Sequence, residues 1–352
     1  MRRNKNQQPY IYEDYEEDYE LRKEMARRIF LKKRRKKRRR RRIVFCSFLI
    51  LSILIGYVAA RAQLELSNTL NIIARDNEND LSDVDVSNIS LLKDDEVVNI
   101  LLIGADKRAT QTSSGRSDSL MIATIDMKNK QLKLTSLMRD MYVNIPGHIS
   151  NRLNAAYSLG GVSLLYQTLA TNFFIQLDGY VLVDFEAFTN VIDQIGGVDI
   201  TITESEYEHL IDYYDNNKTV RTLQPGKNTM TGKQALYYSR IRKEGNGDFR
   251  RTERQRTVMQ AIFTKVKSLS LTETYDMMKS VMPYITTDLN DSEIISYMKS
   301  VLMMGTTTIH QFRLPVDGTF TEEKIREMAV LVPDIDANGK ALKEFIFNKV
   351  EE

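Results

Sequence analysis

Short apolar runs and amphipathic periods alternate along the chain from residue 97 onward. Residues 97–104 (VVNILLIG) are nearly all apolar, which is typical of a strand buried on both faces of a sheet. The predicted strands are 97–104, 120–126, 132–138, 180–185 and 197–203, with short ones around 311–313 and 330–332. The predicted helices are 154–174 (broken at Gly160-Gly161), 186–195, 231–240, 250–269, two segments in the stretch after 271, and 339–347. This alternation predicts an α/β fold, an α-β-α sandwich of about 250 residues that covers 96–350.

A different pattern precedes this domain, because residues 43–60 are 18 consecutive residues without a charge. At about 1.5 Å per residue the run spans roughly 27 Å, which predicts a single transmembrane helix. Eleven basic residues, 32–42, precede it, so the positive-inside rule places residues 1–42 in the cytoplasm and the chain after 61 outside. A cleaved signal peptide is the alternative. Val58-Ala59-Ala60 is a passable cleavage site, but the apolar run is long for such a peptide.

The net charge of +3 hides two segments of opposite charge. Residues 1–42 hold 18 basic and 7 acidic side chains, whereas the remainder holds 32 basic and 40 acidic ones. The long acidic part excludes a uniformly basic nucleic-acid binder, and the basic run is interpreted as a topology signal that also contacts anionic lipid. Residues 1–42 are predicted to be a disordered tail, acidic and then polybasic, and residues 61–95 an extracellular stalk.

Few residues of the chain suit thiol or imidazole chemistry. Cys46 is the single cysteine, and the three histidines (His148, His209 and His310) are scattered. A disulfide within the chain and a multi-cysteine zinc site are therefore excluded, and a histidine-based triad is disfavoured. Any chemistry must rest on carboxylates and arginines.

Arginines and aspartates stand at the ends of predicted strands and helices, which is where open α/β sheets bind ligands. They are Asp106; Arg116 and Asp118; Arg139 and Asp140; Arg240 and Arg242; and Asp248, Arg250, Arg251, Arg254, Gln255 and Arg256. Any one of them alone is explained by a surface ion pair worth about 0–1 kcal/mol. Together they suit a polyanion with a divalent cation, because guanidinium groups bind phosphate oxygens bidentately and paired carboxylates hold Mg²⁺. This chemistry indicates phosphoryl transfer, and the lack of a Walker-type loop argues against a nucleoside triphosphate.

At these residues the sequence resembles the LytR-CpsA-Psr (LCP) family of Gram-positive cell-wall enzymes. The matching motifs are Asn99–Asp106, Arg116–Ser119, Ser136–Asp140, Leu153–Tyr157 with Gly160-Gly161, Val183–Phe185, Ile195–Asp199, Gly232–Leu236, Arg240–Arg242, Asp248-Phe249 and Arg254-Gln255. They cover roughly 97–268. Their number and order make the resemblance specific, and a single membrane anchor with an outer domain is also a feature of the family.

The resemblance implies a fold with a central mixed sheet and the activity of a phosphotransferase. Such an enzyme moves an anionic or secondary cell-wall glycopolymer from a polyprenyl-pyrophosphate carrier to peptidoglycan. It forms a phosphodiester with the help of Mg²⁺ or Mn²⁺ and releases polyprenyl phosphate. The protein would be a single-pass protein of the cell membrane with an extracellular catalytic domain.

The resemblance also implies a role for each matching residue. Asp106 and Asp118 would hold the metal. The pyrophosphate would be bound by Arg116, Arg139, Arg152, Arg240 and Arg242, with Arg254 and Gln255 in support. Asp248 would position or deprotonate the acceptor hydroxyl. Leu165, Leu169 and Phe173 are candidates for lining a cleft for the polyprenyl tail, although ordinary core packing is the preferred interpretation of any single one.

The sequence departs from the family pattern at three positions. Arg152 stands where the family has Lys, Arg250 replaces a Gly after Asp-Phe, so that the family's next Arg falls on Arg251, and Arg256 replaces a Gln. The last two make the entrance of the predicted pocket more basic.

Three other functions remain open from the sequence. A membrane-anchored regulator or attenuator of wall genes would rest on the basic tail, and a catalytically silent wall-binding protein would need no turnover. Hydrolysis of the polyprenyl pyrophosphate would use the same site, with water in place of the acceptor.

Overall fold

The computed structural model describes residues 70, 73–76, 79–105, 117–214, 218–242 and 247–351. These residues belong to the second of two compact units, Ser67–Glu352. In them, no helix is both long and apolar enough to cross a membrane. The predicted transmembrane helix, 43–60, and the predicted tail, 1–42, lie outside the described residues.

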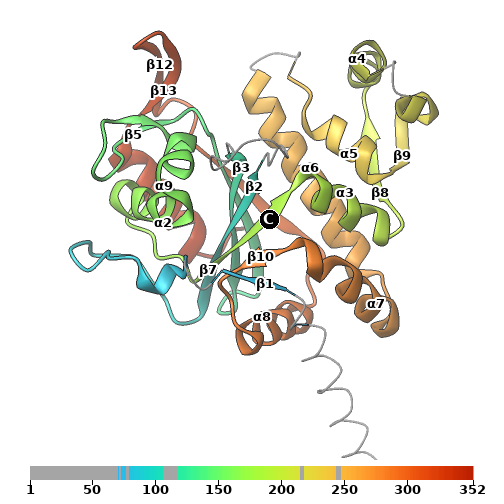
Figure 1. The fold of residues 1–352 in the computed structure, drawn as a ribbon, viewed down its shortest axis with the longest axis horizontal. Helices are drawn as coiled ribbons and strands as arrows, with labels where there is room; N and C mark the ends of the chain where they lie inside the picture. The colour runs from blue at the N-terminus through green and yellow to red at the C-terminus, as the bar shows by residue number, and fades with distance from the viewer. Residues whose placement is uncertain are drawn as a thin grey trace, which may run out of the picture. The chain divides into compact units, whose positions relative to one another are not determined.

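A seven-stranded mixed sheet runs through the middle of this unit, in the order β1-β10-β7-β2-β3-β4-β11 (Figure 1). Its strands are β1 (Ala74–Arg75), β2 (Val97–Ala105), β3 (Ser117–Asp126), β4 (Gln131–Leu137), β7 (Gly179–Asp184), β10 (Thr286–Thr287) and β11 (Ile309–Leu314). β2, β3 and β4 pair antiparallel, whereas β2 with β7 and β4 with β11 pair parallel. The predicted α/β fold with a central mixed sheet is thus confirmed.

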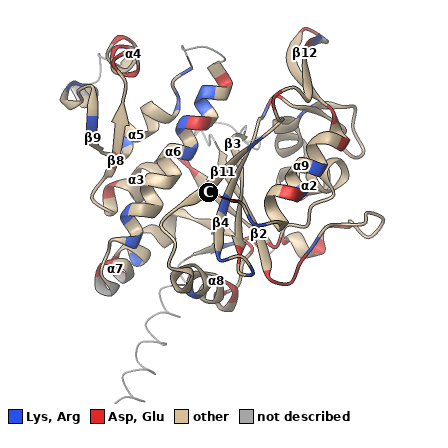
Figure 2. Ribbon diagram, turned by 180° about the vertical axis from the view of Figure 1, so that it is seen from behind, with Lys and Arg blue, Asp and Glu red and all other residues tan. Residues whose placement is uncertain are grey.

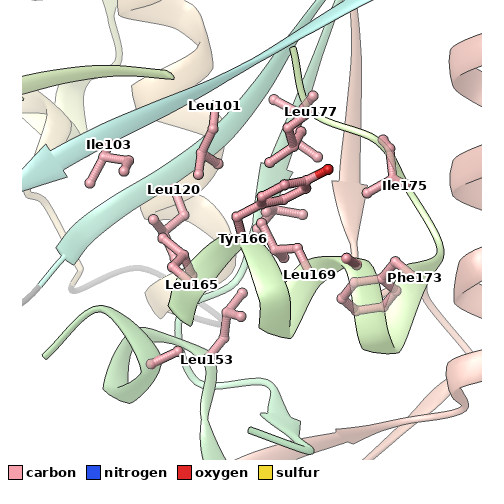
Figure 3. Packing of buried hydrophobic residues seen from close by; sticks show 14 of the residues in the cluster. Leu101, Ile103, Leu120, Leu153, Leu165, Tyr166, Leu169, Phe173, Ile175 and Leu177 are labelled. Atoms are coloured by element: carbon pink, nitrogen blue, oxygen red, sulfur yellow. The ribbon is translucent and has the colours of Figure 1, made fainter. Parts of the chain in front are cut away.

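Helices cover both faces of the sheet (Figures 1 and 2). α2 (Leu153–Phe173) and α9 (Ile335–Phe347) lie on one side, and α3 (Phe185–Gln194), α6 (Gly247–Lys267) and α8 (Asp291–Met304) lie on the other. Side chains of a strand point alternately to the two faces, so odd-numbered residues of β2 pack under α2 and even-numbered ones face α6 and α8. Figure 3 shows Leu165 and Leu169 of α2 facing Leu101 and Leu120 of the sheet.

A smaller apolar cluster lies beside the main sheet. The hairpin of β8 (Val198–Ile202) and β9 (Gly226–Met230) packs there with α3, α4 (Glu204–Tyr214), α5 (Gly232–Ser239) and one face of α6. The remaining elements are α7 (Leu271–Val281), the pair β5 (Tyr142–Val143) and β6 (Asn151–Arg152), the hairpin of β12 (Phe320–Ile325) and β13 (Met328–Pro333), and the 3-10 turns η1 (Leu81–Asp83), η2 (Lys218–Thr222) and η3 (Met282–Tyr284). α6 therefore stands between the small cluster and the main sheet.

The predicted break in α2 is confirmed, because Gly160 and Gly161 have non-helical backbone angles inside it. Gly161 has φ 65°, a left-handed value that glycine tolerates best.

The predicted stalk, 61–95, needs correction in its described part. β1 pairs with β10 at the edge of the main sheet, and Ile73 and Leu81 are buried. The hydroxyl of Tyr180 donates to Asp76 Oδ2 at 2.7 Å. A two-residue strand carries too little periodicity to be read from sequence, and its partner lies more than 200 residues away in the chain.

Candidate active site

Three guanidinium groups surround the carboxylate of Asp248, in the first turn of α6. Asp248 Oδ2 lies 3.4 Å from Arg139 Nε, and its Oδ1 lies 3.3 Å from an Nη of Arg251 and 3.7 Å from Arg242 Nε. Arg139 follows β4, and Arg242 follows α5. The structure thus brings together three of the predicted residues, since Arg139 meets Arg242 and Asp248, which follow it by more than 100 positions in the chain.

A glycine allows α6 to begin beside Arg242. A Cβ on Gly247 would lie 2.4 Å from the carbonyl oxygen of Arg242, a distance that no side chain tolerates. The close approach positions Asp248 at the N-terminal end of α6, where the helix dipole also favours a carboxylate.

Arg251 belongs to this cluster, although the resemblance gave the supporting role at the pyrophosphate to Arg254. Asp248, Arg251 and Gln255 are three and four residues apart, which places them on one face of α6. Arg254 lies on another face, where its Nε is 2.7 Å from Glu206 Oε1 and it donates to the carbonyl oxygen of Ile241. The structure therefore gives Arg254 a buried ion pair that ties α6 to α4. The helical spacing from Asp248 was the signal that could have selected Arg251.

The other predicted arginines occupy two different places. Arg240, at the end of α5, lies over the ring of Phe185, with 4.8 Å between its Cζ and the ring centroid. Arg152 instead donates two hydrogen bonds to the carbonyl oxygen of Ala329, near β13. The structure does not bring Arg152 to the Asp248 cluster.

An apolar cavity of about 270 Å³ begins at these arginines. Arg240, Arg242, Arg251 and Gln255 line it together with Ser119, whose hydroxyl donates to Gln255 Oε1 at 3.2 Å. Farther along α6 the lining becomes apolar, with Met259 and Ile262, and Val281 of α7. Because residues 251 and 262 of a helix lie about 16 Å apart, the cavity has a cationic end and an apolar end.

The cavity lies on the face of the sheet that is opposite to α2. Its wall includes Leu102, Met121, Val181 and Val183, and the residues next to them in each strand belong to the core under α2. Leu165, Leu169 and Phe173 are fully buried in that core. The core-packing interpretation of these three residues is thus confirmed, and other residues line the cavity.

The carboxylate of Asp140 is buried next to the cluster. Its Oδ1 has no hydrogen-bond partner among the described residues. Burial raises the pKa of Asp140 above its usual value, and the nearby charge of Asp248 raises it further, against the opposing charges of Arg139 and Arg251. The folded protein therefore binds the Asp140 proton more tightly than the unfolded chain does.

We expect Asp140→Asn to raise the free energy of unfolding at pH 7 and to lose this advantage below about pH 4. The reason is that a raised pKa stabilises the folded state in acid and that this stabilisation is lost as the pH rises through the folded-state value. Urea unfolding of the full chain at both pH values measures the difference. Asp85→Asn is the control, and its effect on the free energy of unfolding should have the opposite sign, because hydrogen bonds from Ser87 lower the pKa of Asp85. An equal effect of Asp140→Asn at both pH values would contradict the argument.

Asp106 and Arg116 lie outside the described residues, as does the side chain of Asp118. The backbone of β3 nevertheless has a β-bulge at Asp118, because Gly104 pairs with Ser119 and the next residue, Ala105, pairs with Ser117. Asp118 is the extra residue, and bulges occur often beside active sites. Asp106 directly follows Ala105 in the chain. Among the described residues, no three metal-ligand side chains form a cluster.

Comparisons with known proteins give one consistent result. A model of the LytR_cpsA_psr family matches residues 57–344. The teichoic acid transferase TagU of Bacillus mycoides is 33% identical over 298 residues, which are 84% of this chain and 91% of TagU. The regulatory protein MsrR of Staphylococcus aureus is 30% identical over 260 residues, 72% of this chain and 76% of MsrR. The structure of Bacillus subtilis YwtF (TagT) with bound octaprenyl pyrophosphate lipid is similar with a TM-score of 0.57 and 25% identity, over 73% of this chain and 95% of TagT.

Proposed function

Because the chain belongs to the LytR-CpsA-Psr family, we propose that it transfers a cell-wall glycopolymer from a polyprenyl-pyrophosphate carrier to peptidoglycan. The observation that carries the proposal is the cavity, apolar along one part and cationic at one end. A polyprenyl pyrophosphate has the matching shape, with a long apolar tail and a charged head. The names of TagU and of the lipid-bound TagT structure support the same assignment.

The cationic end suits the pyrophosphate head of such a carrier. Arg240, Arg242 and Arg251 line the cavity there, and Arg139 stands on the other side of Asp248. Guanidinium groups bind phosphate oxygens in pairs and stay charged, so they stabilise the charge that develops on the leaving polyprenyl phosphate. The apolar walls hold the tail and exclude water from the phosphorus atom that reacts.

The transfer forms one bond and breaks another. The acceptor hydroxyl oxygen bonds to the phosphorus that carries the glycan, and the bond from that phosphorus to the bridging oxygen breaks. Polyprenyl phosphate then leaves. The side chain of Asp248 is 22% exposed and can reach both the arginines and an incoming hydroxyl, so we assign it to position that hydroxyl and accept its proton.

A divalent cation fits the carboxylates next to this cluster. Asp106 and Asp118 would supply its hard oxygen ligands, and the bulge at Asp118 sets this residue apart from the regular pairing. When Mg²⁺ or Mn²⁺ is bound, it neutralises charge on the pyrophosphate oxygens. Arg116, close to Asp118 in the chain, belongs to the same proposed head-group site.

We also propose that residues 43–60 anchor the protein in the cell membrane, with residues 1–42 in the cytoplasm and the catalytic domain outside. The uncharged run and the basic residues before it support this orientation. A membrane anchor would hold the cavity close to its lipid substrate.

The full chain is expected to release polyprenyl phosphate from a lipid-linked glycan only when peptidoglycan and Mg²⁺ are both present. The measurements are the released polyprenyl phosphate and the glycan that becomes covalently bound to peptidoglycan. Chelation of the metal should abolish both, and Asp118→Ala should match that loss. Release without any glycan on peptidoglycan would show hydrolysis, and no release at all would contradict the proposal.

Regulation of wall genes is the second candidate, favoured by the name of MsrR. It requires residues 61–352 to act from the cytoplasm. Protease treatment of intact cells distinguishes the two functions, because only an outer domain is digested.

A further inference from the structure

A second pair of arginines lies beside the Asp248 cluster, outside the cavity lining. Arg256, on α6, donates to Ser136 Oγ at 3.0 Å and to Gln311 Oε1 at 3.1 Å. Arg313, on β11, donates to Asp317 Oδ1 at 2.5 Å. Ser136, which accepts from Arg256, is the residue of β4 that pairs with Arg313 of β11, so the two arginines meet at the same position of the sheet. Burial lowers the pKa of Arg256, and the positive charge of Arg313 lowers it further, against the opposing charge of Glu253.

This pair adjoins the proposed pyrophosphate site through two chain neighbours. The Arg313 guanidinium lies over the ring of Phe249, 4.3 Å from its centroid, and also contacts Met138 Sδ at 3.7 Å. Phe249 follows Asp248 and Met138 precedes Arg139, and Asp248 and Arg139 form one of the ion pairs of the cluster. Arg313 thus contacts a chain neighbour of each member of that ion pair, and it does not belong to the residues that line the cavity.

The positive charge of the two guanidinium groups is only partly neutralised by anionic side chains among the described residues. Arg256 donates to a hydroxyl and to an amide oxygen, both neutral. The carboxylate of Asp317 is 84% exposed, whereas the Arg313 side chain is 15% exposed. An exposed partner contributes little, so an anion can replace Asp317 at small cost.

We propose that Arg256 and Arg313 form a second anion subsite, which binds a phosphate or carboxylate group on the first sugars of the donor glycan. The assignment rests on the proposed function. With the tail in the cavity and the pyrophosphate at the Asp248 cluster, the covalently attached glycan has to leave the cluster on the side away from the cavity. Arg313 lies next to the cluster and outside the cavity lining, with its guanidinium over the ring of Phe249. The subsite would make the enzyme prefer a glycan that is charged close to its lipid linkage.

The test compares two lipid-pyrophosphate disaccharides that differ only by one phosphate on the sugar next to the pyrophosphate. Their dissociation constants are measured with the full chain, independently of turnover. The wild type is expected to bind the phosphorylated donor about tenfold more tightly, the effect of one charge-assisted hydrogen bond. Arg256→Gln should remove this preference and leave the affinity for the neutral donor unchanged. Arg313→Gln should act in the same way.

Arg250→Gln is the matched control, because it removes the same charge from the same helix. The Arg250 side chain is 60% exposed and pairs with Glu253 at 2.9 Å, so its loss should change either constant less than twofold. The subsite would be overturned if the wild type bound both donors with the same dissociation constant. It would also be overturned if Arg256→Gln weakened the binding of both donors equally. A third contradicting result would be that Arg256→Gln weakens only the binding of a carboxylate-bearing peptidoglycan fragment. Donor preference without turnover would instead overturn the transferase function and leave the subsite standing.

Discussion

Arg251→Ala is expected to lower kcat/KM for glycan transfer by about 10²–10³-fold, the usual effect of removing one preorganised donor from a developing oxyanion. Arg251 is 3% exposed, contacts Asp248 and lines the cationic end of the cavity. In the proposed complex its guanidinium would contact the phosphate from a position that is shielded from solvent. The measurement is the rate of polyprenyl phosphate release with a lipid-linked glycan and peptidoglycan.

Two further variants show whether the effect arises from phosphate binding. Arg250→Ala removes the preceding arginine, which is largely exposed, and should leave kcat/KM within about a factor of five. Arg251→Lys keeps the charge but loses the planar fork, so it should recover only part of the rate. If Arg251→Ala folds and turns over at the wild-type rate, the cationic end of the cavity does not bind the pyrophosphate.

Lys133→Met is expected to lower the free energy of unfolding by about 3–5 kcal/mol, because it leaves a buried carboxylate without its countercharge. Lys133 Nζ lies 2.6 Å from Asp126 Oδ2, and both side chains are fully buried. The same Nζ donates to the carbonyl oxygens of Ile346 and Asn348 at 2.8 Å each. All three of its hydrogens are used, and they tie the end of α9 to β4.

Urea unfolding of the full chain measures this loss, and a double-mutant cycle with Asp126→Asn apportions it. The double variant should lose less than the sum of the two single variants, because no buried charge remains unpaired in it. Lys128→Met is the control for an exposed pair. The Lys128 side chain is 54% exposed and lies 3.4 Å from Asp94, so its loss should cost less than about 1 kcal/mol. An equal cost for Lys133→Met and Lys128→Met would contradict the role of burial.

Local periodicity was sufficient to predict the main strands and helices. The continuous apolar run at 97–104 is β2, and the two glycines at 160–161 interrupt α2 as expected. β1 and β12 were not predicted. β1 is two residues long, and β12 is mostly exposed and polar, so neither has an apolar period to detect.

The candidate site was predictable in composition but not in arrangement. Arg139, Arg240, Arg242, Asp248 and Gln255 do meet around one end of one cavity. Arg254 and Arg152 do not join them. The choice between Arg251 and Arg254 depends on how α6 is rotated about its axis, and that rotation is set by its packing between the main sheet and the β8–β9 cluster.

The α/β class, the family and the cationic chemistry could be predicted from the sequence, because each depends on local spacing or on motifs within short segments. The fold in three dimensions was needed to show which guanidinium groups face Asp248, where the apolar cavity lies, and that Arg256 and Arg313 meet next to the cluster. These features join residues 50 to more than 100 positions apart. Their contacts depend on strand order and helix rotation, which no local pattern of apolar and polar residues encodes.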